Sequence, residues 1–153
     1  MEKTLVILKP SAVERGLVGQ ILTRFQQKGL TIVGIKMMQL DEKLLRVHYA
    51  HLIEKPFFPL LLASMMATPV IVVCLQGRDA VRVVRLMTGA TNGREALPGT
   101  IRGDFSMSGQ ENIVHASSSL EDARAEVERF FLPSEIFEWE PRGIRFIYSP
   151  DEV

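Results

Sequence analysis

His115 carries the first chemical signal in this sequence of 153 residues. It ends the short apolar run Asn112–His115 and is followed, after one alanine, by three serines, where a strand is expected to give way to a helix. Ser118 and Glu121 have the spacing of a capping box, which predicts that the helix begins there. Because N–H groups in a first helical turn attract anions, we expect an anion site beside the imidazole.

A glycine-containing segment lies upstream of this histidine, from Pro98 to Asp104. Its glycines let the backbone approach a ligand, and the guanidinium of Arg102 stays charged and binds phosphate oxygens in a fork. Neither feature suffices alone, since most histidines in globular proteins are packing or surface residues. Together, Arg102 and His115 suggest phosphoryl transfer through a histidine, although their spacing alone indicates only an anion site that contains a histidine.

Composition restricts the class of protein. With 46% hydrophobic residues and no linker, the chain is expected to form a single domain over residues 1–153. Lys plus Arg and Asp plus Glu both total 18, which gives no sign of nucleic-acid binding. Five arginines against three acids between Arg78 and Asp104 favour a small phosphate ligand instead.

Cysteine use and hydropathy bear on the compartment. The single cysteine, Cys74, lies in an apolar strand-like run and is expected to be a buried thiol. No intrachain disulfide is possible, and the N-terminus lacks the regions of a signal peptide. The apolar stretch at residues 56–77 is interrupted by prolines and polar residues, so it is a poor membrane span. These features predict a cytoplasmic protein without a membrane segment.

Hydrophobic periodicity predicts the elements that position these residues. Strands are expected at residues 4–8, 31–40, 70–75 and 112–115, and helices at 18–28, 41–52, 58–66, 79–86 and 119–131. Asp41 and Asp79 are expected to cap their helices, Gly29 to end the first one, and residues 89–103 to form a loop.

The order of these elements indicates an α/β fold of the α+β sandwich type. A ferredoxin-like βαββαβ core, with an antiparallel four-stranded sheet covered by helices, is the simplest topology that fits. A doubly wound parallel sheet ranks second, because neither glycine motif of the nucleotide-binding parallel folds occurs.

Six motifs follow one another along nearly the whole chain: Lys9-Pro10, Arg15–Gly19, Lys55–Phe58, Gly89–Asn92, Pro98–Phe105 and Asn112-x-x-His115. Together they closely resemble the nucleoside diphosphate kinase family. The resemblance implies a ping-pong kinase of broad base specificity that maintains nucleoside triphosphate pools. A nucleoside triphosphate would phosphorylate the histidine, which then passes the group to a different nucleoside diphosphate. The partners would be ATP, GTP, GDP and ADP, with Mg²⁺ as cofactor on their phosphates.

Carried over residue by residue, the resemblance makes His115 the nucleophile. Glu126 and Ser117 would orient its ring, since a carboxylate partner fixes which nitrogen is free. Lys9 would join them in catalysis. The nucleotide contacts would be Lys9, Tyr49, Phe57, Leu61, Arg85, Thr91, Arg102 and Asn112.

These contacts divide between phosphate and base. Arg85, Thr91 and Arg102 would clamp the phosphates, because cations offset the charge of a transferring phosphoryl group. Phe57 would stack on the base with Leu61 beside it, and any base offers a π face for such stacking. The remaining contacts, to ribose and phosphate, would come from Lys9, Asn112 and Tyr49.

The chain departs from the family pattern at several positions. It reads Ala116-Ser117-Ser118-Ser119 in place of Gly-Ser-Asp-Ser, and Lys9-Pro10-Ser11-Ala12 in place of Lys-Pro-Asp-Gly. Gly93 replaces a proline, and Gly109 replaces the apolar residue opposite the stacking aromatic. Serine still caps a helix, and every residue assigned to the chemistry is present, so full activity is expected.

Two other classes of function compete with this reading. One is a non-catalytic nucleotide-binding or regulatory protein of the same fold, which the departures favour. The other is an RNA-binding module, which would need exposed aromatic residues on adjacent strands and a basic face. His48 and His51 have the spacing of half a metal site but are expected to be surface or packing residues, with Mg²⁺ held by phosphate and water. The tail 145–148 resembles that of hexameric family members and predicts a homohexamer.

Overall fold

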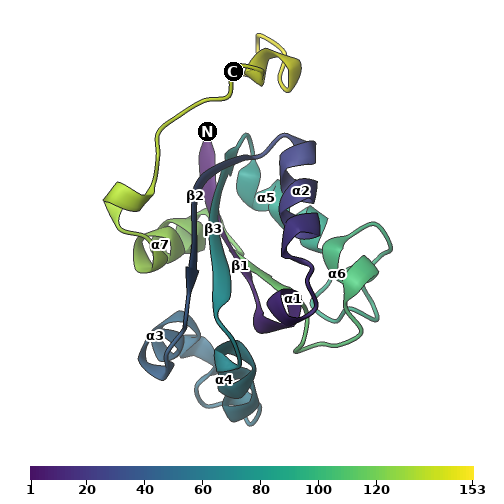
Figure 1. Cartoon of the computed structure of the whole chain (residues 1–153), viewed down its shortest axis with the longest axis vertical. Helices are drawn as coiled ribbons and strands as arrows, with labels where there is room; N and C mark the ends of the chain where they lie inside the picture. The colour runs from purple at the N-terminus through teal and green to yellow at the C-terminus, as the bar shows by residue number, and fades with distance from the viewer.

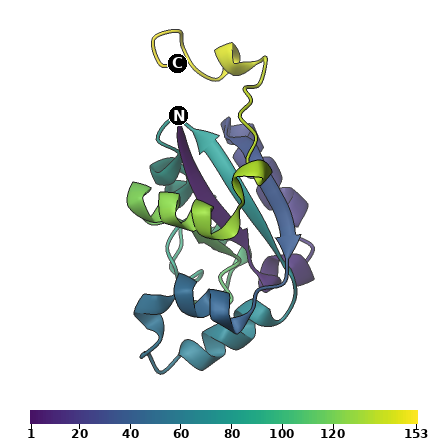
Figure 2. The ribbon, with the colours of Figure 1, turned by 90° about the vertical axis from the view of Figure 1, so that its left-hand side faces the viewer.

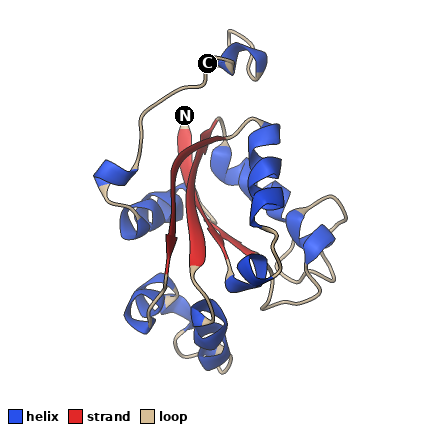
Figure 3. Cartoon of the chain, in the orientation of Figure 1, coloured by secondary structure: helices blue, strands red, loops and turns tan.

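Four strands form one antiparallel sheet in the computed structural model, which describes all residues from 1 to 153. They are β1 (Glu2–Leu8), β2 (Thr31–Met38), β3 (Val70–Gly77) and β4 (Val114–Ala116). The order across the sheet is β2-β3-β1-β4, and each neighbouring pair is antiparallel (Figures 1 and 3). This arrangement confirms the ferredoxin-like core, and the parallel alternative is wrong.

Seven α-helices surround the sheet: α1 (Pro10–Glu14), α2 (Val18–Lys28), α3 (Glu42–His48), α4 (Phe58–Met66), α5 (Ala80–Thr88), α6 (Ile101–Phe105) and α7 (Leu120–Phe130). Single 3-10 turns lie at Ala50–Leu52, Pro133–Glu135 and Ile144–Phe146. Figures 1 and 2 show α2 and α5 on one side of the sheet, α7 on the other, and the α3–α4 pair at one end. No helix is both long enough and apolar enough to cross a membrane.

Two apolar cores fill the spaces between these layers because side chains alternate along β1. Val6 and Leu8 pack toward α2 and α5, whereas Leu5 and Ile7 pack toward α3, α4 and α7. All four side chains are fully buried, which explains the unbroken apolar run in the sequence. With helices on both faces, the sheet offers no open surface of the kind an RNA-binding module needs.

Cys74 lies on β3 within the second core, as expected from its apolar surroundings. Burial raises the pKa of its thiol to about 12. The thiolate is therefore disfavoured, and this cysteine acts as a small apolar side chain.

Helix α2 matches its predicted bounds, and Gly29 ends it in the left-handed conformation with φ 106°. Asp41 caps α3 as predicted, because its carboxylate accepts the Leu44 N–H at 2.8 Å. Helix α3 nevertheless stops at His48, and Leu52 belongs to the separate 3-10 turn.

The predicted cap at Asp79 is wrong. Asp79 has φ 52°, and its carboxylate accepts no backbone N–H from α5, only a side-chain N–H of Arg82 at 3.4 Å. The Val81 N–H instead donates to the carboxylate of Glu2, at 3.2 Å. A residue from the start of the chain therefore caps α5, which no local pattern could indicate.

The predicted start of α7 is displaced by one residue. Ser119 rather than Ser118 is the N-cap, and its hydroxyl oxygen accepts the Asp122 N–H at 3.0 Å. The Ser118 hydroxyl donates to the carboxylate of Asp122 instead. The predicted capping box of Ser118 and Glu121 is therefore wrong, although a serine does cap this helix.

The loop predicted at residues 89–103 contains the start of α6, so Arg102 lies on a short helix. The strand predicted at residues 112–115 is also displaced, because Ile113 has φ 75° and the Val114 N–H donates to the Asn112 carbonyl at 2.8 Å. This γ-turn interrupts the extended run, and β4 begins only after it. His115 thus lies in the middle of β4 rather than at its end.

Replacement of Ser119 by alanine is expected to lower the free energy of unfolding by about 1 kcal/mol, the usual value of an N-cap. Urea denaturation at one fixed protein concentration measures the change. Ser118→Ala is the matched control and should cost less, since its hydroxyl bonds only an exposed carboxylate. Equal losses in the two variants would contradict the assignment of the cap.

Candidate active site

A pocket of about 1060 Å³ opens beside β4 and brings together residues from distant parts of the chain. Ten of the eleven predicted site residues line it: Lys9, Tyr49, Phe57, Leu61, Arg85, Thr91, Arg102, Asn112, His115 and Glu126. The eleventh, Ser117, is fully buried behind Glu126 and bonds to it. The fold therefore gathers in one place the whole set that the resemblance indicated.

The imidazole of His115 is held by a carboxylate from α7. Its Nε2 lies 2.8 Å from Oε1 of Glu126, which also accepts the Ser117 hydroxyl at 2.8 Å. Ser117 is itself fixed to β1, because its backbone N–H donates to the Leu5 carbonyl at 3.1 Å. A carboxylate only accepts hydrogen bonds, so Nε2 of His115 carries the proton and Nδ1 keeps its lone pair.

Lys9 and Asn112 form a polar pair beside the γ-turn. The Lys9 ammonium donates to Oδ1 of Asn112 at 2.6 Å, and both residues are buried. The Asn112 amide donates in turn to the carbonyls of Thr91 and Gly109, each at 3.0 Å. The strained φ of Ile113, which costs roughly 1–3 kcal/mol, is what turns the chain between Asn112 and β4.

Arg102 binds the protein backbone as well as facing the pocket. Its guanidinium donates to the carbonyls of Asn112, Gly89 and Val114, at 3.2, 2.9 and 2.6 Å. An arginine has five N–H groups, so two remain for a ligand. Arg102 therefore ties α6 to the segment before His115, a role that the sequence did not indicate.

Positive charge in the pocket has no carboxylate partner. Neither Lys9 nor Arg102 forms a salt bridge. Burial, and then the charge of Arg102, lowers the pKa of Lys9 to about 8. Burial, followed by the charge of Arg85, lowers the pKa of Arg102 to about 10. A bound polyanion would relieve this repulsion.

The anion site predicted at the start of α7 differs from what the structure builds. The Asp122 N–H is taken by Ser119, and Asp122 is itself a pocket-lining residue, so a carboxylate would face an anion there. The cations come instead from Lys9, Arg85 and Arg102, on three other segments.

Apolar side chains form part of the pocket wall. Phe57 is 43% exposed, so its ring is open to a ligand, whereas Leu61 is buried in the core beneath. Gly109 lines the pocket without a side chain, together with Gln110. A flat aromatic ligand in this pocket therefore has one exposed aromatic ring to stack on.

Tyr49 also lines the pocket. It is buried, and desolvation together with the nearby charge of Glu126 raises the pKa of its phenol well above the ordinary value. The hydroxyl therefore stays protonated and is a neutral group able to donate a hydrogen bond.

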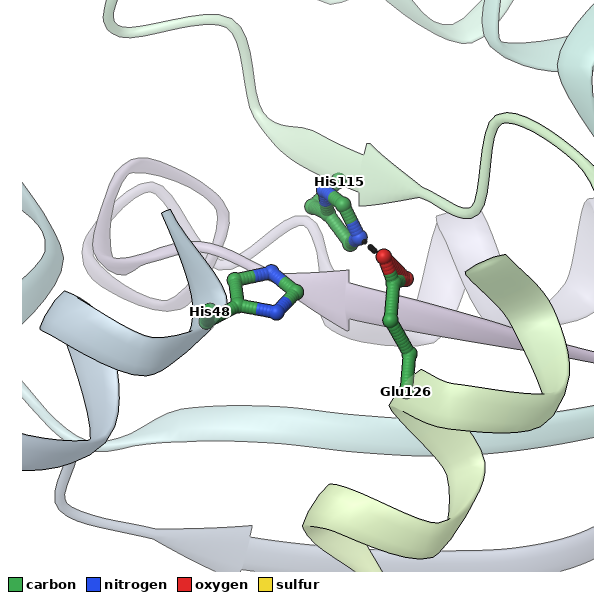
Figure 4. A group of neighbouring side chains, drawn as sticks. All are labelled: His48, His115 and Glu126. Carbon is green, nitrogen blue, oxygen red and sulfur yellow. Dashed lines mark hydrogen bonds and ion pairs between the residues drawn. The ribbon is translucent and has the colours of Figure 1, made fainter. Parts of the chain in front are cut away.

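His48 is a packing residue, one of the two roles expected for it, but the sequence did not indicate where it packs. It is buried and lies against the predicted nucleophile, with 4.6 Å between the centroids of the His48 and His115 rings (Figure 4). Arg129 donates to its Nδ1 at 2.9 Å. One signal was available, because Arg129 follows Glu126 by three residues and so shares its face of α7.

His48, His115 and Glu126 also resemble a metal-ligand set, since one polar atom of each lies within 4.8 Å of the others. Their hydrogen bonds oppose such a site. An arginine only donates, so Nδ1 of His48 is unprotonated and the neutral ring carries its proton on Nε2, the nitrogen that would bind a metal. Glu126 is already engaged by His115 and Ser117.

A carboxylate-held imidazole in a cationic pocket that ends in an exposed aromatic ring defines a phosphotransferase site for nucleotides. The family model for nucleoside diphosphate kinase matches residues 2–136. The chain is 57% identical over 152 residues to a nucleoside diphosphate kinase of Parabacteroides distasonis, covering 99% of each protein. It is 51% identical over 151 residues to one of Pyrococcus horikoshii, covering 97% and 96%.

A solved structure agrees with these matches. The nucleoside diphosphate kinase of Halobacterium salinarum in complex with CDP superposes with a TM-score of 0.93 at 41% identity, covering 96% of this chain and 98% of that one. The chain belongs to the nucleoside diphosphate kinase family. This family transfers a phosphoryl group from a nucleoside triphosphate to a nucleoside diphosphate, so the non-catalytic alternative is not favoured.

The lowered pKa of Lys9 predicts a pH-dependent affinity for nucleotide. As the pH rises through about 8, the ammonium loses its charge and its attraction for phosphate. The dissociation constant of ADP should therefore rise about tenfold between about pH 7 and pH 9, the limit for one linked proton. Isothermal titration calorimetry measures it. Lys9→Met should bind more weakly at pH 7 and show no such rise, and a flat wild-type profile would contradict the assignment.

Proposed function

We propose that this chain transfers the γ-phosphoryl group of a nucleoside triphosphate to a nucleoside diphosphate through a phosphohistidine at Nδ1 of His115. The hydrogen bond between His115 Nε2 and Glu126 carries the proposal. It leaves Nδ1 as the only ring nitrogen with a free lone pair, and a neutral imidazole is a competent nucleophile. The Nδ1 lone pair attacks the γ-phosphorus, the bond to the β-phosphate oxygen breaks, and the nucleoside diphosphate leaves.

The second half-reaction reverses these roles. A terminal phosphate oxygen of an incoming nucleoside diphosphate attacks the phosphohistidine, and the bond to Nδ1 breaks. Throughout, Glu126 holds the proton on Nε2 and balances the positive charge of the phosphorylated ring. Ser117 fixes that carboxylate to β1, which supports its role as a positioning residue.

Six further residues are assigned to the phosphates and ribose. Lys9, Arg85 and the two free N–H groups of Arg102 supply the positive charge for the phosphates. Tyr49 contributes a hydroxyl that stays protonated. The polar side chains of Thr91 and Asn112 line the same part of the pocket and complete the assignment.

Mg²⁺ is proposed to enter with the nucleotide. Glu126 and Asp122 are the acidic residues of the pocket, and both already accept hydrogen bonds from neighbouring side chains. Phosphate and water oxygens are therefore assigned as the ligands of the ion.

Base recognition is assigned to Phe57, supported from below by Leu61. An exposed aromatic ring stacks on any base, so the proposed enzyme accepts purines and pyrimidines alike. Gly109 adds no side chain to the pocket wall, which supports broad specificity at modest affinity for the base.

We assign residues 1–153 to one domain and propose that it assembles as a homohexamer. The support is exposed apolar surface on the segment after α7, where Leu132, Phe137 and Phe146 are 65%, 64% and 82% exposed. Figure 1 shows this segment extending away from the body of the molecule. Exposed apolar residues on an extended tail are typical of an interface between subunits.

The phosphohistidine is tested by mixing the protein with γ-phosphate-labelled ATP and Mg²⁺, isolating it at alkaline pH, and adding unlabelled GDP. We expect acid-labile, alkali-stable label that moves to GTP, with the phosphate on Nδ1 by nitrogen-15 NMR. The control His115→Gln should take no label. Nucleotide binding without any label on the wild type would overturn the proposed reaction.

The assembly is tested by analytical ultracentrifugation. The expected sedimenting species has the mass of six subunits of 17.2 kDa each. A mass of four subunits, or of one, would refute the hexamer while leaving the proposed reaction untouched.

A further inference from the structure

A buried histidine that the proposed reaction does not use lies against the nucleophile. His48 is the last residue of α3 and is 6% exposed. Its ring meets that of His115 edge to face, at 75° and 4.6 Å between centroids. The rings of Tyr49 and Phe130 pack around it at 4.6 and 5.0 Å. Its position is therefore fixed on several sides.

The tautomer of His48 is set by Arg129. The guanidinium donates to Nδ1 at 2.9 Å and has no acceptor atom, so Nδ1 must be unprotonated. Burial, assisted by the positive groups around it, lowers the pKa of His48 to about 2, so the ring is neutral. The groups facing it are His115 on β4, Arg129 and Glu126 on α7, His51 after α3, and Lys9 after β1. A neutral ring with bare Nδ1 carries its proton on Nε2.

That Nε2–H is an unusual group, because it is buried and has no hydrogen-bond partner. Leaving a buried donor unpaired costs roughly 1–3 kcal/mol, so it persists only where the surroundings impose it. One polar atom of His48 lies within 4.8 Å of both His115 and Glu126, and Figure 4 shows the ring facing that pair.

We propose that His48 is a positioning residue for the nucleophile. Arg129 locks the tautomer that turns Nε2–H of His48 toward the His115–Glu126 pair, and this polar edge, with the edge-to-face packing of the two rings, holds the His115 ring in the orientation from which Nδ1 attacks. The proposal rests on the proposed function. It adds a second clamp to that of Glu126, so that α7 orients the nucleophile twice, directly through Glu126 and through His48 by way of Arg129.

Two replacements of His48 separate its N–H from its packing. His48→Phe keeps an aromatic ring against His115 but has no donor. His48→Gln keeps the donor near the position of Nε2 and offers an amide oxygen to Arg129. We expect the Phe variant to lose roughly 10- to 100-fold in the single-turnover rate of phosphohistidine formation, with the KM for ATP within about twofold of the wild type. The Gln variant should recover most of that rate.

Arg129 provides the spectroscopic readout, which does not depend on activity. Arg129→Met leaves a good helix former on α7 but removes the donor to Nδ1. Nitrogen-15 NMR of the wild type should show His48 with Nε2 protonated and Nδ1 bare. The variant should populate the opposite tautomer and lose phosphorylation rate in proportion.

Three results would overturn the proposal. They are a wild-type His48 protonated on Nδ1, an unchanged rate in His48→Phe, and equal rate losses in the Phe and Gln variants. Equal losses would mean that only the packing matters. Failure of the proposed function is distinguishable, because the wild type would then form no phosphohistidine and the tautomer would still be measured.

Discussion

The pairing of β4 with β1 is the interaction on which the site depends. Although β4 has only three residues, its register places His115 on the α7 side of the sheet. Just outside the paired residues, the Ser117 N–H donates to Leu5 and the Lys9 N–H donates to the Ile113 carbonyl. Side chains alternate between faces, so a slip of one residue would turn His115 toward α2 and α5. The buried apolar β1 prevents that slip.

Buried positive charge is the second constraint. Lys9 and Arg102 are both more than nine-tenths buried, and no carboxylate neutralises either. Desolvated cations cost stability, and the lowered pKa of Lys9 expresses that cost. A protein carboxylate paired with these cations would offset the cost of burying them, but it would also remove their attraction for phosphate. The unpaired cations therefore lower the stability of the free protein and at the same time attract a polyanion.

Helix α7 links these two constraints. Glu126 and Arg129 lie three residues apart on one face, and each meets an imidazole from a different element. The carboxylate of Glu126 determines which nitrogen of His115 is protonated, and the guanidinium of Arg129 determines which nitrogen of His48 is protonated. One rigid helix thus sets the hydrogen positions of two neighbouring rings, one of which is the proposed nucleophile.

Local pattern accounted for much of the fold. The bounds of α2 and α4 follow from apolar spacing and from Gly29, because these signals depend only on nearby residues. The same reasoning failed for α5, whose cap is Glu2. It also failed for the γ-turn at Ile113, whose carbonyl accepts the backbone N–H of the distant Lys9. Groups separated by most of the chain cannot be paired by periodicity.

The sequence by itself determined which residue types form the site and, through its motifs, which chemistry they serve. It also determined the antiparallel α+β architecture, since alternation and helical spacing are properties of the linear chain. Only the tertiary structure decided which nitrogen of His115 is free, that His48 lies against it, and that Arg102 binds backbone carbonyls. Hydrogen-bond direction depends on the relative positions of β4, α3 and α7, and packing of the two cores sets those positions.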